Sequence, residues 1–178
     1  MDRGVAAAAI ALAAAMGFRR MGFTAQYVRF LGFSCILAAE ALADFDSLEI
    51  PDRFQAAGLV WWLLFGFCAR EGWKAYVLRS LAGGLPTAAG LLGLTAIADR
   101  VAGQETMGGG DIKLFFVTGM YLGFAQNLLN LIVSCLLGIL FAAAVKKKRI
   151  PFGPSIAAST VFVMLTGGQI VDWYLSLF

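Results

Sequence analysis

The 178-residue sequence contains no histidine, few charged residues and three cysteines, and each shortage excludes a kind of site. Without histidine the chain cannot form a Ser-His-Asp triad, a Cys-His pair or a histidine-ligated zinc site. Cys35, Cys68 and Cys135 stand far apart in apolar sequence and form no CxxC pair, so we expect small core residues, no metal site and no cofactor. Any hydrolysis by this chain must therefore use carboxylates.

Charged residues make up 14% of the chain, compared with about 25% in soluble domains. Hydrophobic residues make up 60%, compared with about 45–50%. This excess indicates that the chain resides in a lipid bilayer. The formal net charge of +3 is too small to indicate nucleic-acid binding, so no nucleic-acid partner is predicted. The length suits one membrane-embedded domain, residues 1–178, with about six or seven crossings at about 20 residues each.

Continuous apolar runs, without alternation, favour helices over barrel strands, because a lipid-spanning helix satisfies its own backbone hydrogen bonds. The predicted fold class is all-α, a polytopic membrane helical bundle with about six core transmembrane helices. The first, alanine-rich run is either a signal-like segment or an extra N-terminal helix, and we favour the helix. Gly83, Gly84, Gly90 and Gly93 are expected to be places of close helix contact. The apolar segments are 4–18, 27–45, 54–69, 76–98, 112–125, 128–145 and 155–178.

The polar gaps between these segments predict an orientation in the membrane. Gaps 44–53, 99–111 and 146–154 fall on one side, and the basic run 146–149 marks that side as cytoplasmic. Basic residues between 70 and 79 fall on the other side and argue against this orientation. The expected location is the cytoplasmic (inner or plasma) membrane, multi-pass, with the polar motifs facing the cytosol.

Two acidic positions lie where an apolar run meets a polar gap on the same predicted face. Asp44 opens an acidic stretch that ends at Asp52, and Asp111 follows three glycines. Each has an ordinary explanation, a solvated helix end for the first and a helix N-cap for Asp111. Together they could share one proton, the ionised carboxylate activating a water while the protonated one polarises a scissile carbonyl. Glu40, one helical turn before Asp44, either tunes the pair or is a neutral side chain.

Three motifs, in order, resemble those of the type IV prepilin peptidase family, the GxGD membrane aspartyl proteases. Residues 44–52, DFDSLEIPD, resemble the family's first aspartate motif. Residues 108–111, GGGD, match GxGD, and residues 150–154, IPFGP, look like a signature that the family carries before its last apolar segment. The resemblance covers a core of about residues 27–178.

The resemblance implies a membrane aspartic endopeptidase that cleaves the N-terminal leader of type IV prepilins or pilin-like preproteins, after a glycine, at the cytoplasmic membrane face. Aligned by motif, Asp44 and Asp111 are the catalytic pair, with Asp46 as a rival for the first position. Lys113, which matches the form GxGDxK, either serves the site or snorkels to the interface. The supporting motif residues are Gly108, Gly109, Gly110, Lys113, Pro51, Asp52, Pro151, Gly153 and Pro154.

The chain departs from longer bacterial members, which resemble it in the peptidase core but carry an additional segment with paired CxxC motifs and an N-methylation activity. The CxxC motifs are absent here, so the expectation is a short, peptidase-only form, with methylation in doubt. Two other functions stay open. Intramembrane acids could belong to a small ion-coupled transporter or channel, and the chain could be an inactive structural subunit of a secretion system. The native substrate and the oligomeric state are not predicted.

Overall fold

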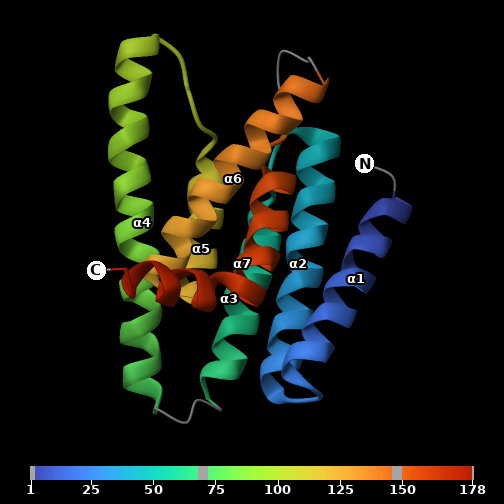
Figure 1. The fold of residues 1–178 in the computed structure, drawn as a ribbon. Helices are drawn as coiled ribbons and strands as arrows, with labels where there is room; N and C mark the ends of the chain where they lie inside the picture. Colours follow the sequence, from blue (N-terminus) through green and yellow to red (C-terminus); the bar gives the residue numbers. More distant parts are fainter. Residues whose placement is uncertain (1–2, 68–71, 146–149, 178) are drawn as a thin grey trace.

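The computed structural model describes residues 3–67, 72–145 and 150–177, and these residues form α-helices joined by short turns (Figure 1). No strand occurs in those three stretches, which confirms the predicted all-α fold. Every apolar segment of the sequence corresponds to one helix, including the first. The helices are α1 (Arg3–Met21), α2 (Ala25–Ser47), α3 (Asp52–Gly66), α4 (Trp73–Ala102), α5 (Gly109–Leu122), α6 (Phe124–Val145) and α7 (Gly153–Leu175).

Four helices, α1, α4, α6 and α7, are long and apolar enough to cross a membrane, compared with the six or seven crossings that the sequence suggested. Two of the others are short, because α3 has 15 residues and α5 has 14, whereas a spanning helix needs about 20. The remaining one, α2, has 23 residues but carries Arg29, Glu40, Asp44 and Asp46. The chain is thus a membrane protein, and the helices that carry the acidic motifs, α2 and α5, are not among the four that could span a membrane by length and composition.

A glycine turn makes α5 short. The backbone of Gly123 has a φ of 80°, a conformation that side chains disfavour, and its amide donates to the carbonyl of Gly119 at 2.8 Å. The chain then reverses directly into α6, a few residues earlier than the expected gap at 126–127. This turn places the first turn of α5 and the last turn of α6 toward the same end of the bundle (Figure 1).

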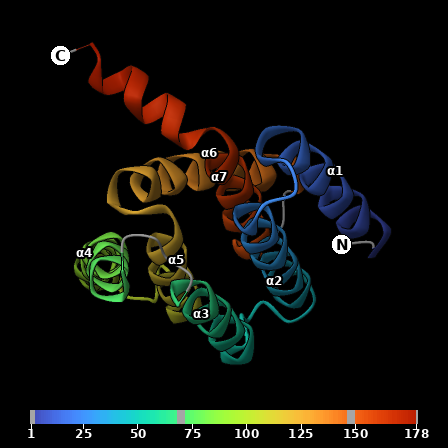
Figure 2. The ribbon, with the colours of Figure 1, turned by 90° about the horizontal axis from the view of Figure 1, so that it is seen from below.

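The core lies where α2, α5 and α7 meet. Phe33 and Leu37 of α2, Leu114 and Phe115 of α5, and Ile156 of α7 are each at most 1% exposed and belong to one apolar cluster. Seen along the bundle, α1 and α3 flank α2, α4 lies beside α5, and the last turns of α7 project away from the other helices (Figure 2). The three helices that carry the sequence motifs therefore pack directly against one another.

Small residues allow α4 and α5 to approach closely, as expected for Gly83 and Gly84. A β-carbon on Gly84 would lie 2.7 Å from the carbonyl oxygen of Phe116, and one on Gly119 would lie 2.7 Å from the carbonyl oxygen of Gly83. Backbone atoms cannot yield as flexible side chains do, so glycine is required at these contacts.

Two other expectations about small residues are wrong. Gly90 and Gly93 face open space, with no heavy atom within 4 Å of the place that a β-carbon would take, so they are not helix contacts. Cys35 and Cys135 are exposed on α2 and α6 and are not core residues, because both lie on faces that turn away from the bundle. Cys68 and the basic run 146–149 lie outside the described residues.

A buried polar network joins α5, α6 and α7. Asn127 donates to the carbonyl of Phe115 at 2.9 Å and accepts from the hydroxyl of Thr118 at 3.0 Å. Asn130 accepts from the hydroxyls of Ser159 and Thr160 on α7. Hydrogen bonds between helices replace the hydrophobic driving force that lipid does not provide. The network therefore sets the position of α7 relative to α5, and with it the position of the IPFGP motif.

Candidate active site

Asp44 lies in the last turn of α2 and is 5% exposed. Its Oδ2 accepts the backbone N–H of Gly153, the first residue of α7, at 2.6 Å. A β-carbon on Gly153 would lie 2.7 Å from the same oxygen, so the absence of a side chain at this position allows the contact. The glycine of the IPFGP motif thus packs on the first predicted catalytic aspartate.

Asp111 lies in the first turn of α5 and is partly buried. Gly108 occupies the N-cap position, in an extended conformation, so the interpretation of Asp111 as the N-cap is wrong. Asp111 stands at the third helical position, where a carboxylate can reach back to the amide of the N-cap residue, and Gly108 provides such a backbone hydrogen bond. Gly110 packs against Ile50, because a β-carbon on it would lie 3.3 Å from the Ile50 Cβ.

The two aspartates act on each other electrostatically. Burial raises the pKa of Asp111 above its ordinary value, the nearby negative charge of Asp44 raises it further, and the Gly108 hydrogen bond partly lowers it. Two carboxylates that share a poorly solvated site cannot both ionise easily, so one of them retains its proton. Burial also raises the pKa of Asp44, and the Gly153 N–H partly lowers it, so both carboxyl groups hold a proton more readily than a solvated aspartate does.

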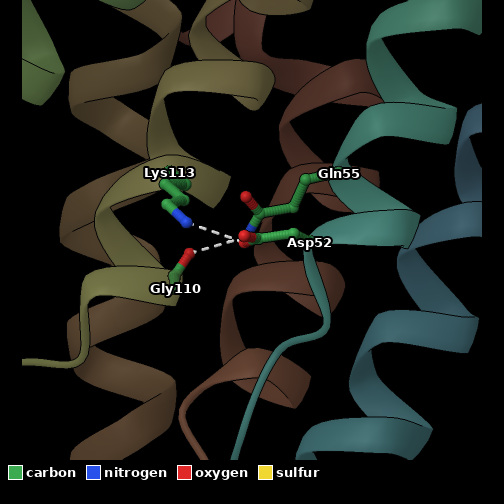
Figure 3. A network of polar contacts seen from close by, with 4 residues as sticks. All are labelled: Asp52, Gln55, Gly110 and Lys113. Atoms are coloured by element: carbon green, nitrogen blue, oxygen red, sulfur yellow. Dashed lines mark hydrogen bonds and ion pairs between the residues drawn. The ribbon is translucent and has the colours of Figure 1, made fainter.

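Two contacts join the starts of α3 and α5 next to this pair (Figure 3). The ammonium of Lys113 lies 2.7 Å from Oδ1 of Asp52, and the side-chain amide of Gln55 donates to the carbonyl of Gly110 at 2.9 Å. Figure 3 shows Lys113 and Asp52 pointing toward one another across the gap between the helices. The GxGD motif is therefore tied to the first turn of α3.

Comparisons with known proteins identify the family of the chain. The sequence profile described as the type IV leader peptidase family matches residues 30–143. The chain belongs to the type IV leader peptidase family. A prepilin leader peptidase/N-methyltransferase of Bacillus subtilis is 33% identical over 178 aligned residues, which cover 93% of this chain and 66% of that protein. The protein of the same name from Aeromonas hydrophila is 32% identical over 80% of this chain and 51% of its own length.

This leader peptidase family member spans about half to two thirds of the length of these curated relatives. None of the solved structures matches it. The family profile covers Asp44 and Asp111 but ends before Gly153. The contact between Gly153 and Asp44 therefore extends the site beyond the matched region.

The other predicted site residues of this family member lie around the pair with different degrees of exposure. Asp46, the rival for the first aspartate, is exposed on α2, whereas Asp44 is buried where it accepts the Gly153 N–H. Pro51 is the N-cap residue of α3, and Pro154 stands at the start of α7, so both prolines fix where a helix begins. Pro151 is partly buried in the turn before α7.

Gln55 is a site residue that the sequence motifs did not reveal. It is 5% exposed, and its amide satisfies the carbonyl of Gly110 next to Asp111. The sequence signal was a polar residue one helical turn after Asp52 in an otherwise apolar helix. Such a residue inside a membrane protein usually faces a polar partner, but the partner on α5 cannot be read from spacing.

Glu40 is 2% exposed, deeper in the bundle than Asp44 and one turn earlier on α2. Its Oε2 is buried and accepts no hydrogen bond from the part of the chain that the structure describes. Glu40 therefore sits near the pair without a contact that links it to either aspartate.

Proposed function

We propose that this chain is a membrane aspartic endopeptidase that cleaves the N-terminal leader of type IV prepilins or pilin-like preproteins. The observation that carries the proposal is that residues of three separate motifs converge: Asp44 accepts the Gly153 N–H, and Asp111 lies close enough to Asp44 for the two charges to interact. Membership of the type IV leader peptidase family, with relatives named prepilin leader peptidase/N-methyltransferase, supports the substrate class.

The charge distribution suggests which aspartate has which role. The Gly153 amide stabilises an ionised Asp44, which would accept a proton from a water molecule as the general base. A protonated Asp111 would donate a hydrogen bond to the carbonyl oxygen of the scissile bond, where negative charge develops. The hydroxide attacks the carbonyl carbon, the C–N bond of the resulting tetrahedral intermediate breaks, and the proton held by Asp44 passes to the leaving amine.

The position of the pair suits a substrate that is itself partly in the membrane. Both aspartates stand at helix ends, Asp44 in the last turn of α2 and Asp111 in the first turn of α5, so the pair would lie near one membrane face rather than at the middle of the bilayer. A prepilin leader that emerges from the bilayer could bring its cleavage site, after a glycine, to this face. We place this face on the cytosolic side from the charge of the polar gaps.

Co-expression with a prepilin tests the proposal directly. Leader removal is followed on a gel for the wild-type chain, for Asp44→Asn and for Asp111→Asn, with Asp46→Asn as the matched control on the exposed side of the same helix. We expect both pair variants to lose cleavage and the control to retain it. Normal cleavage by Asp44→Asn or Asp111→Asn would overturn the assignment of the pair. Ion flux through reconstituted protein without any proteolysis would favour a transporter instead.

A further inference from the structure

A cavity of about 300 Å³ lies at the other end of the bundle from the aspartate pair. The last turn of α1, the first turns of α2 and α6, the end of α5 and the middle of α7 line it. Its polar lining comes from Arg20, Gln26, Arg29, Tyr121 and Gln126. Arg29 and Asp44 share α2, and at about 1.5 Å per residue they stand roughly 22 Å apart along it, so this cavity is separate from the candidate active site.

Arg29 contacts aromatic side chains at the wall of this cavity. Its guanidinium lies 4.9 Å from the ring centroid of Tyr121 and 5.6 Å from that of Tyr76, both within the range of cation–π attraction. The indole N–H of Trp61 donates to its backbone carbonyl at 3.1 Å. Its Nε is buried and donates no hydrogen bond within the described part of the chain.

No acidic side chain among the described residues lines the cavity to balance its positive charge. Its lining residues include Arg20 and Arg29 but no aspartate or glutamate, and neither arginine forms an ion pair among the described residues. Gln126 lies in the first turn of α6, and the amino-terminal end of a helix adds partial positive charge. Two guanidinium groups and the amides of Gln26 and Gln126 therefore surround a space in which an anion would be favoured.

We infer that this cavity binds a phosphate-type anion, either the headgroup of a phospholipid or free phosphate. Guanidinium groups bind phosphate oxygens through paired hydrogen bonds, which a carboxamide can supplement. The volume is at the lower end of the range for small-molecule sites, which suits a headgroup better than a large ligand. Phe30, Met164 and Leu165 add an apolar wall beside the arginines, as a lipid with a charged head and an apolar body requires. The inference does not depend on the proposed proteolysis.

Thermal unfolding of the purified full chain in a neutral detergent tests the inference. The melting temperature is followed by tryptophan fluorescence during titration with dihexanoyl phosphatidylglycerol, with inorganic phosphate and with uncharged dihexanoylglycerol. We expect a saturable rise with an anion and none with the uncharged lipid, because a ligand that binds the folded state stabilises it. Saturation by phosphatidylglycerol alone identifies a lipid site, and equal saturation by inorganic phosphate identifies a free-anion site.

Substitutions in the cavity separate this site from general charge effects. Arg29→Gln and Arg20→Gln are each expected to weaken the midpoint of the anion titration by about tenfold or more, since each removes charge-assisted hydrogen bonds. Arg53→Gln, an exposed arginine at the opposite end of the bundle, is the matched control and should titrate as the wild type does. If Arg29→Gln does not fold, Arg20→Gln decides, because Arg20 is exposed at the end of α1. The inference is overturned if neither anion gives a saturable rise, or if the cavity variants respond as the wild type does.

Discussion

The carboxylate of Asp44 accepts the backbone N–H of Gly153 at 2.6 Å, across a separation of 109 residues in the chain. The bond joins the end of α2 to the start of α7 and so connects the first and the last of the sequence motifs. An N–H donor aimed at a buried carboxylate favours its ionised form. The glycine of the IPFGP motif therefore has both a steric role, because no side chain fits there, and an electrostatic one.

Replacement of Gly153 by alanine should abolish leader cleavage while the chain still folds. The added β-carbon would lie 2.7 Å from Oδ2 of Asp44, and relief of that contact would move α7 away or rotate the carboxylate. Leader processing on a gel and the melting temperature are measured together. Gly90→Ala is the control, since its β-carbon would meet open space and alanine stabilises a helix interior by roughly 0.5–1 kcal/mol. Wild-type cleavage by Gly153→Ala would show that the contact is dispensable.

The two contacts between α3 and α5 should differ in their contribution to stability. Gln55→Ala leaves the partly buried carbonyl of Gly110 without its side-chain partner, a loss at the lower end of the about 1–3 kcal/mol that an unsatisfied buried group costs. Lys113→Ala removes an ion pair whose side chains are 58% and 74% exposed, a contact for which about 0.2–1 kcal/mol is typical.

Denaturation of the two variants in the same detergent measures this difference. Gln55→Ala is expected to lower both the melting temperature and the cleavage rate more than Lys113→Ala does, because Gly110 directly precedes Asp111. Asp52→Ala serves as the partner control for Lys113→Ala, and it should cost slightly more, because Asp52 also stands in the first turn of α3, where a negative charge is favourable. A larger loss of stability from Lys113→Ala than from Gln55→Ala would contradict this order.

The sequence was sufficient to predict the helices and the motifs, but not how far each helix extends. Apolar runs predicted every helix from α1 to α7, since a membrane helix needs little more than continuous hydrophobicity. The end of α5 depends on the positive φ of Gly123, and a glycine in an apolar run does not reveal whether it turns or packs. Gly83 packs and Gly90 does not, although their surroundings in the sequence are alike.

The sequence also predicted some of the residues of the candidate site. Asp44, Asp111 and Gly153 belong to motifs that resemble a known family, so they could be named from the sequence. The partner of Gln55 and the cavity around Arg29 depend on tertiary contacts between helices distant in sequence, and no local pattern encodes them. Such contacts require the packing of α2, α5 and α7 to be known first.

The pH dependence of stability should change when Asp111 is replaced by asparagine. Because burial and the charge of Asp44 raise the pKa of Asp111, the folded chain holds this proton more tightly than the unfolded chain does. The stability that this group contributes is therefore fully present below the ordinary aspartate pKa of about 3.9, and it is lost as the pH rises through the raised pKa of Asp111.

Asparagine does not ionise, so Asp111→Asn should have a higher melting temperature than the wild type near pH 8 and a similar one near pH 4. Melting curves across this range measure the difference, with Asp46→Asn as an exposed control, and a difference that does not depend on pH would contradict the expectation.

Glu40 provides the test of whether a third carboxyl group participates in the site. It is 2% exposed, and no described donor contacts its Oε2, so a buried negative charge there would be unstable. Glu40→Gln retains the shape of the side chain and removes the possibility of ionisation. We expect it to raise the melting temperature above pH 7 and to leave leader cleavage within about twofold of the wild type.

The pH profile of cleavage is measured alongside, because a residue that tunes the aspartate pair would shift that profile even if the rate at one pH were preserved. Glu40→Ala is the comparison, since the cavity that it creates should cost about 2–5 kcal/mol whether or not the carboxyl group matters. A shifted profile in Glu40→Gln would identify Glu40 as a positioning residue, whereas an unchanged profile with a higher melting temperature would confine the proton chemistry to Asp44 and Asp111.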